Sequence, residues 1–332
     1  MTNTCSIILA AGEGTRMKSE KPKVLSEVLF KPMIKWVVEA VEKSAINDIC
    51  IITGFKHEML CSYLNSIGKN YQTALQTQRK GTAHAVMMAS DFLNKNHGKD
   101  ILILNGDSPF IDSSTLQNSL KLHREKGNSA TVISAKIENP FGYGRIVRDN
   151  IGRLTSITEQ KDASDEIKKI KEVNSGAYWF RVDSLLDVLY DIKSDNAQNE
   201  LYLPDAIKLL ISKRLNVGSF MSGSKYTVLG ANDCLQLNEL NEIARKIVLN
   251  KLMTNGVDIP CTDGVIISAE AEFGKAVRIL PNTIIKGNCY VGNHCTIGPN
   301  SYIENSFICD DNILNSIYCI NKKIEQKTAL FP

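Results

Sequence analysis

The sequence lacks a long apolar run and a strong excess of charge of either sign. No stretch of its 332 residues approaches the roughly 20 apolar residues that a membrane-spanning helix needs. The first four residues lack the basic segment of a secretory signal peptide. The 39 Lys and Arg side chains nearly balance 36 Asp and Glu, and a net charge of +3 indicates no basic surface for nucleic acid or a membrane. We therefore expect a cytoplasmic protein that binds neither nucleic acid nor a membrane.

Cysteine pairs at metal-binding or redox spacing are also absent. The nine cysteines are odd in number, lie scattered along the chain and include no C-x-x-C pair. This pattern argues against a disulfide framework and against a zinc site. We expect most of these cysteines to be small buried apolar residues.

Two common phosphate-binding motifs are missing, although a glycine-rich loop lies near the N-terminus. G-x-x-x-x-G-K-[ST] does not occur, and G-x-G-x-x-G fails because Met17 stands where the third glycine should fall. Instead, an apolar run at residues 7–9 predicts a buried strand and is followed by A-A-G-E-G-T-R. Small residues let the backbone approach a ligand, and Arg16 and Lys23 add positive charge. The loop suits a polyphosphate, but alone it is as consistent with a surface loop that carries solvated charges.

Apolar runs alternate with helical patterns through the first part of the chain. Residues 49–54, which end in a glycine, and residues 101–104 predict buried strands, and residues 33–44, 57–64 and 81–94 predict helices. Such alternation indicates βαβ units and a mostly parallel sheet. Ligands bind such sheets at the carboxyl ends of the strands, so the glycine-rich loop and the segment after residue 104 should share one edge.

Two polar residues lie at predicted strand ends. Asp107 stands in N-G-D-S-P after the strand at 101–104, and Asn232 ends V-L-G-A-N, which we predict as the last strand end of the sheet. Carboxylate and amide oxygens suit Mg²⁺, which takes its remaining ligands from water and substrate phosphates. The alternatives are a helix N-cap for Asp107 and a turn for Asn232.

The hydrophobic period changes after residue 260. Aliphatic residues recur every six positions, and small residues stand two positions before four of them; the aliphatic positions are Ile279, Ile285, Val291, Ile297 and Ile303. This period resembles the hexapeptide repeat of a left-handed β-helix, and an ordinary β-meander is the alternative. The spacing shortens to five at Ile308 and then fades. We therefore expect two to three coils and a polar tail without a repeat from residue 322.

The opening loop carries a more specific signature. L-A-A-G-E-G-T-R-M followed by K-P-K-V-L resembles the signature of sugar-phosphate nucleotidyltransferases. Within them the chain is most similar to the uridyltransferase half of the bifunctional enzymes that make UDP-N-acetylglucosamine. The resemblance implies an α/β fold, with a Rossmann-like mixed, mostly parallel sheet followed by a short left-handed parallel β-helix. It implies a nucleotidyltransferase domain at residues 1–232, a connecting helix at 233–256 and the β-helix with its tail at 257–332.

The resemblance also implies a reaction. UTP and N-acetylglucosamine 1-phosphate would give UDP-N-acetylglucosamine, a cell-wall precursor, and pyrophosphate. The implied mechanism is a direct in-line displacement without a covalent intermediate, with Mg²⁺ as cofactor. Catalysis of such a displacement consists mainly of positioning and charge neutralisation.

Individual positions receive roles from the same resemblance. The implied catalytic cations are Arg16 and Lys23, and the implied metal ligands are Asp107 and Asn232. The implied nucleotide contacts are Leu9, Ala10, Ala11, Gly12, Gln76, Gly81 and Thr82. The implied sugar contacts are Asn105, Gly144, Glu159 and Asn174. The position of Asn105 varies within the family, which leaves its contact with the sugar open.

The C-terminal part departs from the bifunctional enzymes, which continue through a long β-helix with an acetyltransferase site. We expect that activity to be absent here, and a homotrimer built through the short β-helix is a further expectation. Two alternatives stay open. One is the same chemistry on another sugar phosphate or nucleotide, and the other is a non-catalytic protein that binds nucleotide sugars.

Overall fold

The computed structural model describes residues 3–69, 71–327 and 329–330. The chain forms two compact units, the first of Met1–Ser26 with Pro32–Asp233 and the second of Glu27–Lys31 with Cys234–Pro332. A two-stranded sheet of β2 (Glu27–Val28) and β3 (Lys31–Pro32) lies where the chain passes between them in sequence. No helix in the described ranges is long and apolar enough to cross a membrane.

The first unit is built on a mixed sheet with a mostly parallel centre. Its strand order is β11-β7-β10-β6-β1-β4-β5. Only β10 runs antiparallel to its neighbours β6 and β7 along this path, and the antiparallel pair β8 and β9 is attached to β10. The strands are β1 (Thr4–Leu9), β4 (Ile49–Thr53), β5 (Gln72–Leu75), β6 (Asp100–Asn105), β7 (Ala130–Lys136), β8 (Arg145–Arg148), β9 (Leu154–Thr158), β10 (Glu172–Arg181) and β11 (Val217–Met221).

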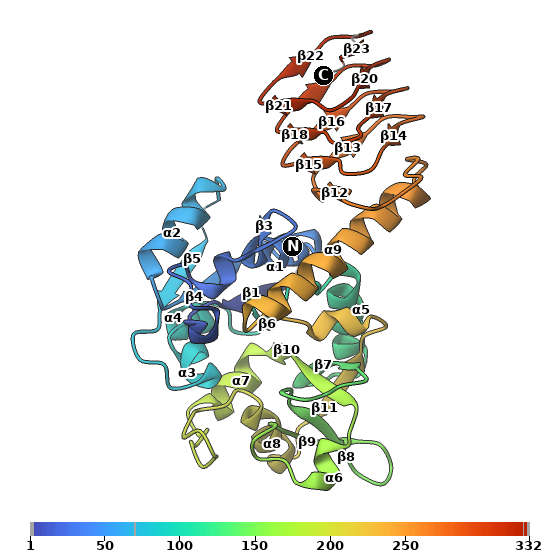
Figure 1. Ribbon diagram of the computed structural model, residues 1–332. Helices are drawn as coiled ribbons and strands as arrows, with labels where there is room; N and C mark the ends of the chain where they lie inside the picture. Colours follow the sequence, from blue (N-terminus) through green and yellow to red (C-terminus); the bar gives the residue numbers. More distant parts are fainter. Residues whose placement is uncertain (1–2, 70, 328, 331–332) are drawn as a thin grey trace. The chain divides into compact units, whose positions relative to one another are not determined.

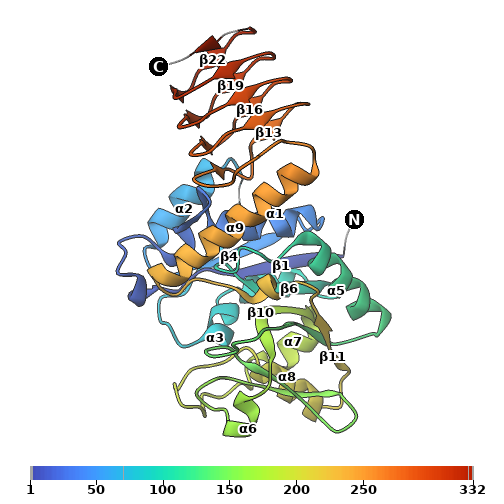
Figure 2. The same cartoon turned by 45° about the vertical axis from the view of Figure 1, so that its right-hand side comes forward.

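Helices cover both faces of this sheet (Figure 1 and Figure 2). Because successive side chains of a strand point to opposite faces, Ile7 and Ile8 of β1 belong to two different core clusters. The cluster of Ile8 includes side chains of α1 (Met33–Lys43), α2 (His57–Ser66) and α5 (Ser113–Glu125). The cluster of Ile7 includes side chains of α3 (Thr82–Met87), α4 (Ser90–Lys95), α7 (Val182–Leu189) and α8 (Asp205–Ser212). Both faces of the central strands are buried, which explains their continuous apolar runs.

Two local predictions for this unit are wrong. The run V-L-G-A-N is not a strand: Val228 ends the 3-10 helix η3 (Lys225–Val228), and residues 229–232 belong to no helix or strand. The Ser224 side chain at the start of η3 accepts a hydrogen bond from the Tyr226 N–H at 3.2 Å. The last strand of the sheet is β11, an edge strand of four half-buried residues and the exposed Met221, whose pattern V-G-S-F-M lacks a clear apolar face. The predicted helix at 81–94 is split into α3 and α4.

Five of the nine cysteines are buried, namely Cys5, Cys50, Cys289, Cys295 and Cys319. Burial raises the pKa of Cys5 and of Cys50 to about 12. These two thiols therefore stay protonated at neutral pH and pack as small apolar residues.

The short helix α6 (Asp165–Lys168) has Ser164 as its N-cap, whose side chain accepts a hydrogen bond from the Ile167 N–H.

The C-terminal part of the second unit starts with α9 (Cys234–Thr254) and continues as a parallel β-helix with three faces. Each face is a sheet of four short strands, and Figure 2 shows β13, β16, β19 and β22 stacked one above another. The first face contains β12 (Ile266–Ile267), β15 (Ile284–Lys286), β18 (Tyr302–Glu304) and β21 (Tyr318–Ile320). The second contains β13 (Glu272–Phe273), β16 (Tyr290–Val291), β19 (Phe307–Ile308) and β22 (Lys323–Ile324). The third contains β14 (Arg278–Ile279), β17 (Thr296–Ile297), β20 (Ile313–Leu314) and β23 (Ala329–Leu330).

The predicted end of the repeat is too early. All five aliphatic positions of the six-residue period are fully buried, but Leu314 and Cys319 continue the buried row beyond Ile308. Lys323–Ile324 pairs with Phe307–Ile308 where a tail without a repeat was expected. In this part of the coil some inward residues are five rather than six positions apart, and Cys319 takes the place of an aliphatic residue. The six-residue period is therefore no longer visible in the sequence.

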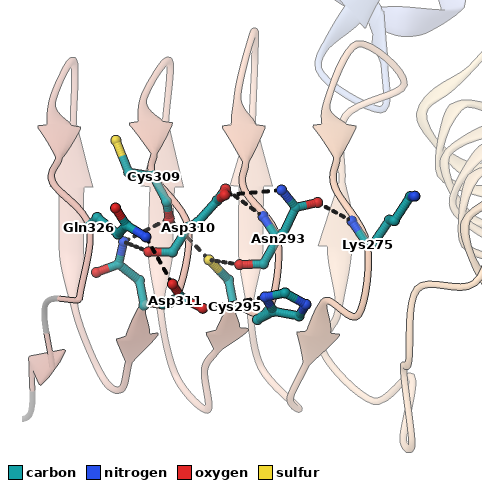
Figure 3. A network of polar contacts seen from close by, with 9 residues as sticks. Lys275, Asn293, Cys295, Cys309, Asp310, Asp311 and Gln326 are labelled. Carbon is teal, nitrogen blue, oxygen red and sulfur yellow. Dashed lines mark hydrogen bonds and ion pairs between the residues drawn. The ribbon is translucent and has the colours of Figure 1, made fainter.

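Polar side chains join neighbouring coils at one series of turns (Figure 3). The Asn293 side-chain oxygen accepts a hydrogen bond from the Lys275 N–H at 2.8 Å. The Asp310 carboxylate in turn accepts hydrogen bonds from the N–H and the side-chain amide of Asn293. A Cβ atom on Gly292 would lie 2.3 Å from the Asp310 carboxylate, so this turn requires glycine. Each turn thus satisfies backbone donors of the preceding coil.

Candidate active site

A cleft of about 400 Å³ opens at the carboxyl ends of β1 and β6 in the first unit. The predicted catalytic, nucleotide-binding and metal-binding residues line it together: Leu9, Ala10, Ala11, Gly12, Arg16, Lys23, Gln76, Gly81, Thr82, Asp107 and Asn232. Asn105, predicted on the sugar side, also lines the cleft. The parallel pairing of β1 with β4 and β6 explains why these loops share one edge.

The glycine-rich loop is fixed at its base by the sheet. The Ala10 N–H donates a hydrogen bond to the Ile52 carbonyl at 2.9 Å, and the loop then turns into the 3-10 helix η1 (Thr15–Met17), which carries the exposed Arg16. Gly14 adopts a left-handed conformation with φ of 66°, and a Cβ atom there would lie 2.8 Å from the Cβ of Lys23. Glycine at this position therefore lets the start of η2 (Lys23–Leu25) pack against the loop.

Lys23 brings three distant segments to one point. Its ammonium group forms an ion pair with the Asp107 carboxylate and donates a hydrogen bond to the Asn232 side-chain oxygen at 2.7 Å. The Lys23 side chain is 12% exposed and that of Asp107 is 24% exposed. A Cβ atom on Gly230 would lie 2.9 Å from the Asp107 carbonyl oxygen, so glycine allows the segment before Asn232 to approach.

These oxygens also suit a hard divalent cation. A carboxylate oxygen of Asp107 and the amide oxygen of Asn232 converge on a single positive charge, the Lys23 ammonium group. Magnesium prefers oxygen ligands, needs few from the protein and takes the others from water and substrate phosphates. Asp107 and Asn232 therefore fit a metal that binds together with a phosphate-bearing substrate.

Gln76 lines the same cleft as the glycine-rich loop. Its residue exposure is 6%, and its side-chain amide donates hydrogen bonds to the Gly81 carbonyl at 3.1 Å and to Nδ1 of His84 at 3.0 Å. Gly81 has φ of 104°, and a Cβ atom there would lie 2.5 Å from the Leu201 carbonyl oxygen. Only glycine fits this close contact, which sets the position of the Gly81 carbonyl.

The remaining predicted sugar contacts form a neighbouring cluster and are not among the residues that line the cleft. The Asn174 N–H donates a hydrogen bond to the Gly144 carbonyl at 2.9 Å, and a Cβ atom on Gly144 would lie 2.8 Å from the Glu159 carboxylate. Asn105 reaches toward the same strand, since its side-chain nitrogen lies 2.2 Å from where a Cβ atom of Gly176 would be. Burial raises the pKa of Glu159, and the nearby Asp162 and Asp205 carboxylates act in the same direction.

The sequence reasoning missed two arginines. Arg79 lines the cleft and forms an ion pair with Glu13 of the glycine-rich loop. Arg145 is 1% exposed and donates a hydrogen bond at 2.7 Å to the side chain of Gln160, next to Glu159. Its place directly after Gly144 in G-Y-G-R is the signal that could have found it.

A family model described as nucleotidyl transferase matches residues 5–236. The chain belongs to the nucleotidyl transferase family. It is therefore a nucleotidyltransferase, as the resemblance predicted, and the predicted fold is confirmed. Residues 270–305 match the bacterial transferase hexapeptide model of six repeats, and the three-faced coil of the second unit is a left-handed β-helix.

Curated relatives cover nearly all of the nucleotidyltransferase. "Bifunctional protein GlmU" of Caldanaerobacter subterraneus subsp. tengcongensis is 41% identical over 93% of this chain and 66% of its own length. The protein of the same name from Acetivibrio thermocellus is 38% identical over 98% of this chain and 70% of its own. The chain thus spans about two thirds of the length of these relatives.

The fold also matches a solved structure. A Bacillus anthracis protein described as a glucose-1-phosphate thymidylyltransferase, crystallised with sucrose, superposes with a TM-score of 0.62 at 22% identity. The match covers 73% of this chain and 95% of that one. At this identity the likeness concerns the fold alone.

Proposed function

We propose that the protein transfers a uridylyl group from UTP to N-acetylglucosamine 1-phosphate in the presence of Mg²⁺, giving UDP-N-acetylglucosamine and pyrophosphate. The observation that carries the proposal is the meeting of Lys23, Asp107 and Asn232 beside the glycine-rich loop in a nucleotidyl transferase. The relatives named Bifunctional protein GlmU support the same reaction class.

The chemistry is one displacement at phosphorus. A phosphate oxygen of the sugar phosphate forms a bond to the α-phosphorus of UTP while the bond to the pyrophosphate oxygen breaks, and the pyrophosphate leaves with that electron pair. No side chain needs to form a covalent bond. Arg16 balances the charge of the leaving pyrophosphate, and Lys23 contacts the reacting phosphates. A magnesium ion held by Asp107 and Asn232 would add charge neutralisation at the phosphate oxygens.

The other predicted residues orient the two substrates. Backbone groups at residues 9–12 hold the nucleotide, and Gln76, Gly81 and Thr82 contact its base. The sugar side is formed by Asn105, Gly144, Glu159 and Asn174. We infer that residues 1–232 are the catalytic domain, residues 233–256 its connecting helix and residues 257–332 a structural β-helix.

We also propose a homotrimer assembled through the β-helix. Two stacked aromatic pairs on its outer surface, Tyr290 with Phe307 and Tyr302 with Tyr318, support this assembly. Sedimentation equilibrium measures the subunit number directly, and a monomer at micromolar concentration would contradict it. The expected lack of acetyltransferase activity stays a prediction that an acetyl-coenzyme A assay checks.

A substrate panel tests the proposed reaction. Purified protein is given UTP and Mg²⁺ with glucose, glucosamine, galactosamine and N-acetylglucosamine 1-phosphates, and released pyrophosphate is measured. We expect the highest kcat/KM with N-acetylglucosamine 1-phosphate and no release when EDTA removes the metal. Preference for another sugar phosphate would replace the proposed acceptor. Binding of UDP-sugar without any release would show a non-catalytic binding protein.

A further inference from the structure

The side-chain amide of Gln76 is held from two sides, which fixes the direction in which it points. The Gln76 N–H donates to the Thr53 carbonyl at 2.8 Å, which anchors the backbone beside the end of β4. The side-chain nitrogen then lies between the Gly81 carbonyl at 3.1 Å and Nδ1 of His84 at 3.0 Å. The backbone contacts of Lys80 and Ala83 with Leu201, at 2.7 and 2.9 Å, keep the loop around Gly81 in place.

Hydrogen-bond chemistry then determines the state of His84. A backbone carbonyl can only accept, so the amide nitrogen of Gln76 and not its oxygen must face Gly81. The second N–H of that nitrogen points to Nδ1 of His84, which must therefore accept. Nδ1 accepts only in the neutral ring that carries its proton on Nε2. Burial lowers the pKa of His84 and the positive charge of Lys80 acts in the same direction, so both favour this neutral form.

Both donors of the Gln76 amide are used in this arrangement, and its carbonyl oxygen is the atom left for a ligand in the cleft. An acceptor pairs with the ring N–H of a uracil or thymine. It is repelled by the ring nitrogen acceptor at the same position of cytosine. The orientation of one amide therefore distinguishes two pyrimidine classes.

We propose that His84 is a positioning residue for nucleobase selectivity: its Nδ1 locks the Gln76 amide so that the carbonyl oxygen accepts from an imide N–H, which favours uridine over cytidine triphosphate. This proposal deepens the proposed function and depends on it for the presence of a nucleotide in the cleft. His84 is not among the residues that line the cleft, so it acts through Gln76.

Three variants separate the hydrogen bond from the packing of the ring. His84→Leu fills much of the ring volume without an acceptor, His84→Ala removes both, and His84→Asn keeps an acceptor near the place of Nδ1. Rates of pyrophosphate release with UTP and with CTP give the ratio of the two kcat/KM values. We expect this ratio to fall about tenfold in the Leu and Ala variants, as for loss of one positioned hydrogen bond. The Asn variant should keep it, and the KM for the sugar phosphate should not change.

His97→Ala is the matched control, because His97 is exposed and pairs with Asp183. An unchanged ratio in folded Leu and Ala variants, or an Asn variant as impaired as Leu, would contradict the proposal. Failure of both Leu and Ala variants to fold would make His84 a structural residue and would contradict it as well. If the wild-type protein releases no pyrophosphate, the proposed function fails by itself. Calorimetric titration with UTP and CTP then reads the same selectivity as a ratio of dissociation constants.

Discussion

At the scale of single residues, the site is organised by one ammonium group. Lys23 contacts a carboxylate and an amide oxygen from segments more than 80 residues away along the chain. The pair is largely buried, and such a pair contributes little net stability because the lost hydration of both charges offsets their attraction. Its effect on a reaction that gathers negative charge is larger, because the cleft holds fixed cations and oxygens where phosphates would bind.

Replacement of Asp107 by alanine separates these two effects. We expect turnover to fall by about 100- to 1000-fold, as for loss of a positioned charge-stabilising group, which corresponds to roughly 3–4 kcal/mol in the barrier. The variant should stay folded, because the Lys23 ammonium group keeps its hydrogen bond to the Asn232 side-chain oxygen, and the melting temperature measures the cost of breaking a largely buried pair. Asp91→Ala, at an exposed position of α4, is the control. Retained activity in Asp107→Ala would contradict the proposed role of Asp107 as a metal ligand.

At the scale of elements, short local interactions place the loops. The N-G-D-S-P loop that carries Asp107 is followed by α5, whose N-cap is Asp112. The Asp112 carboxylate accepts hydrogen bonds from the Thr115 N–H at 2.7 Å and from the Ser114 hydroxyl at 2.6 Å. Burial raises the pKa of Asp112, but these hydrogen bonds outweigh burial and leave the pKa below 3.8.

Asp112→Ala should lower the free energy of unfolding by about 1 kcal/mol, whereas Asp112→Asn keeps a good cap. Because the folded-state pKa is depressed, the cap's charge-dependent stabilisation is complete above pH 3.8 and is lost as the pH falls through the folded-state value. Urea unfolding at neutral and at acid pH measures the free energy of unfolding of the wild type and of Asp112→Asn. On acidification this free energy should fall less in Asp112→Asn than in the wild type, because the asparagine cap does not titrate. Equal acid sensitivity of the Asn variant and the wild type would contradict this role.

The β-helix depends on its inward row of aliphatic side chains. Ile297 is fully buried, whereas Ile313 of the paired strand β20 is 48% exposed. Ile297→Ala should cost about 2–4 kcal/mol, because it removes transfer free energy and leaves a cavity. Ile313→Ala is the matched control and should cost well under half as much. Denaturant unfolding measures both, and equal destabilisation would show that the inward row does not dominate the stability of this unit.

At the scale of the whole molecule, the alternation of strands and helices and the six-residue repeat could be predicted from the sequence. Apolar runs and helical patterns predicted the parallel sheet, and the carboxyl-end rule predicted that residues 12–16 and Asp107 would share an edge. Asn232 reaches that edge too, but from an irregular segment after the 3-10 helix η3 rather than from a strand, because a short apolar pair is compatible with either structure. The β-helix is longer than predicted, since five-residue faces break the period.

Other features depend on packing that no local pattern expresses. An arginine is usually exposed at the surface, but the Arg145 residue is almost fully buried and its guanidinium group donates a hydrogen bond to the Gln160 side-chain oxygen. The contact between Gln76 and His84 needs the turn at Gly81, which is set by Leu201 more than 100 residues later. The strand-end rule and the family resemblance therefore pointed to many residues of the candidate site, while the distances among them came from tertiary structure.

The most direct test of the central claim is phosphorus NMR of the reaction mixture. Wild-type protein with UTP, Mg²⁺ and N-acetylglucosamine 1-phosphate should convert the UTP signals into those of UDP-N-acetylglucosamine and pyrophosphate in equal amounts. The same mixture with Asp107→Ala should stay unchanged over the same time. Intact UTP with the wild-type protein, or its hydrolysis without formation of a nucleotide sugar, would contradict the assignment of the cleft as a uridylyl transfer site.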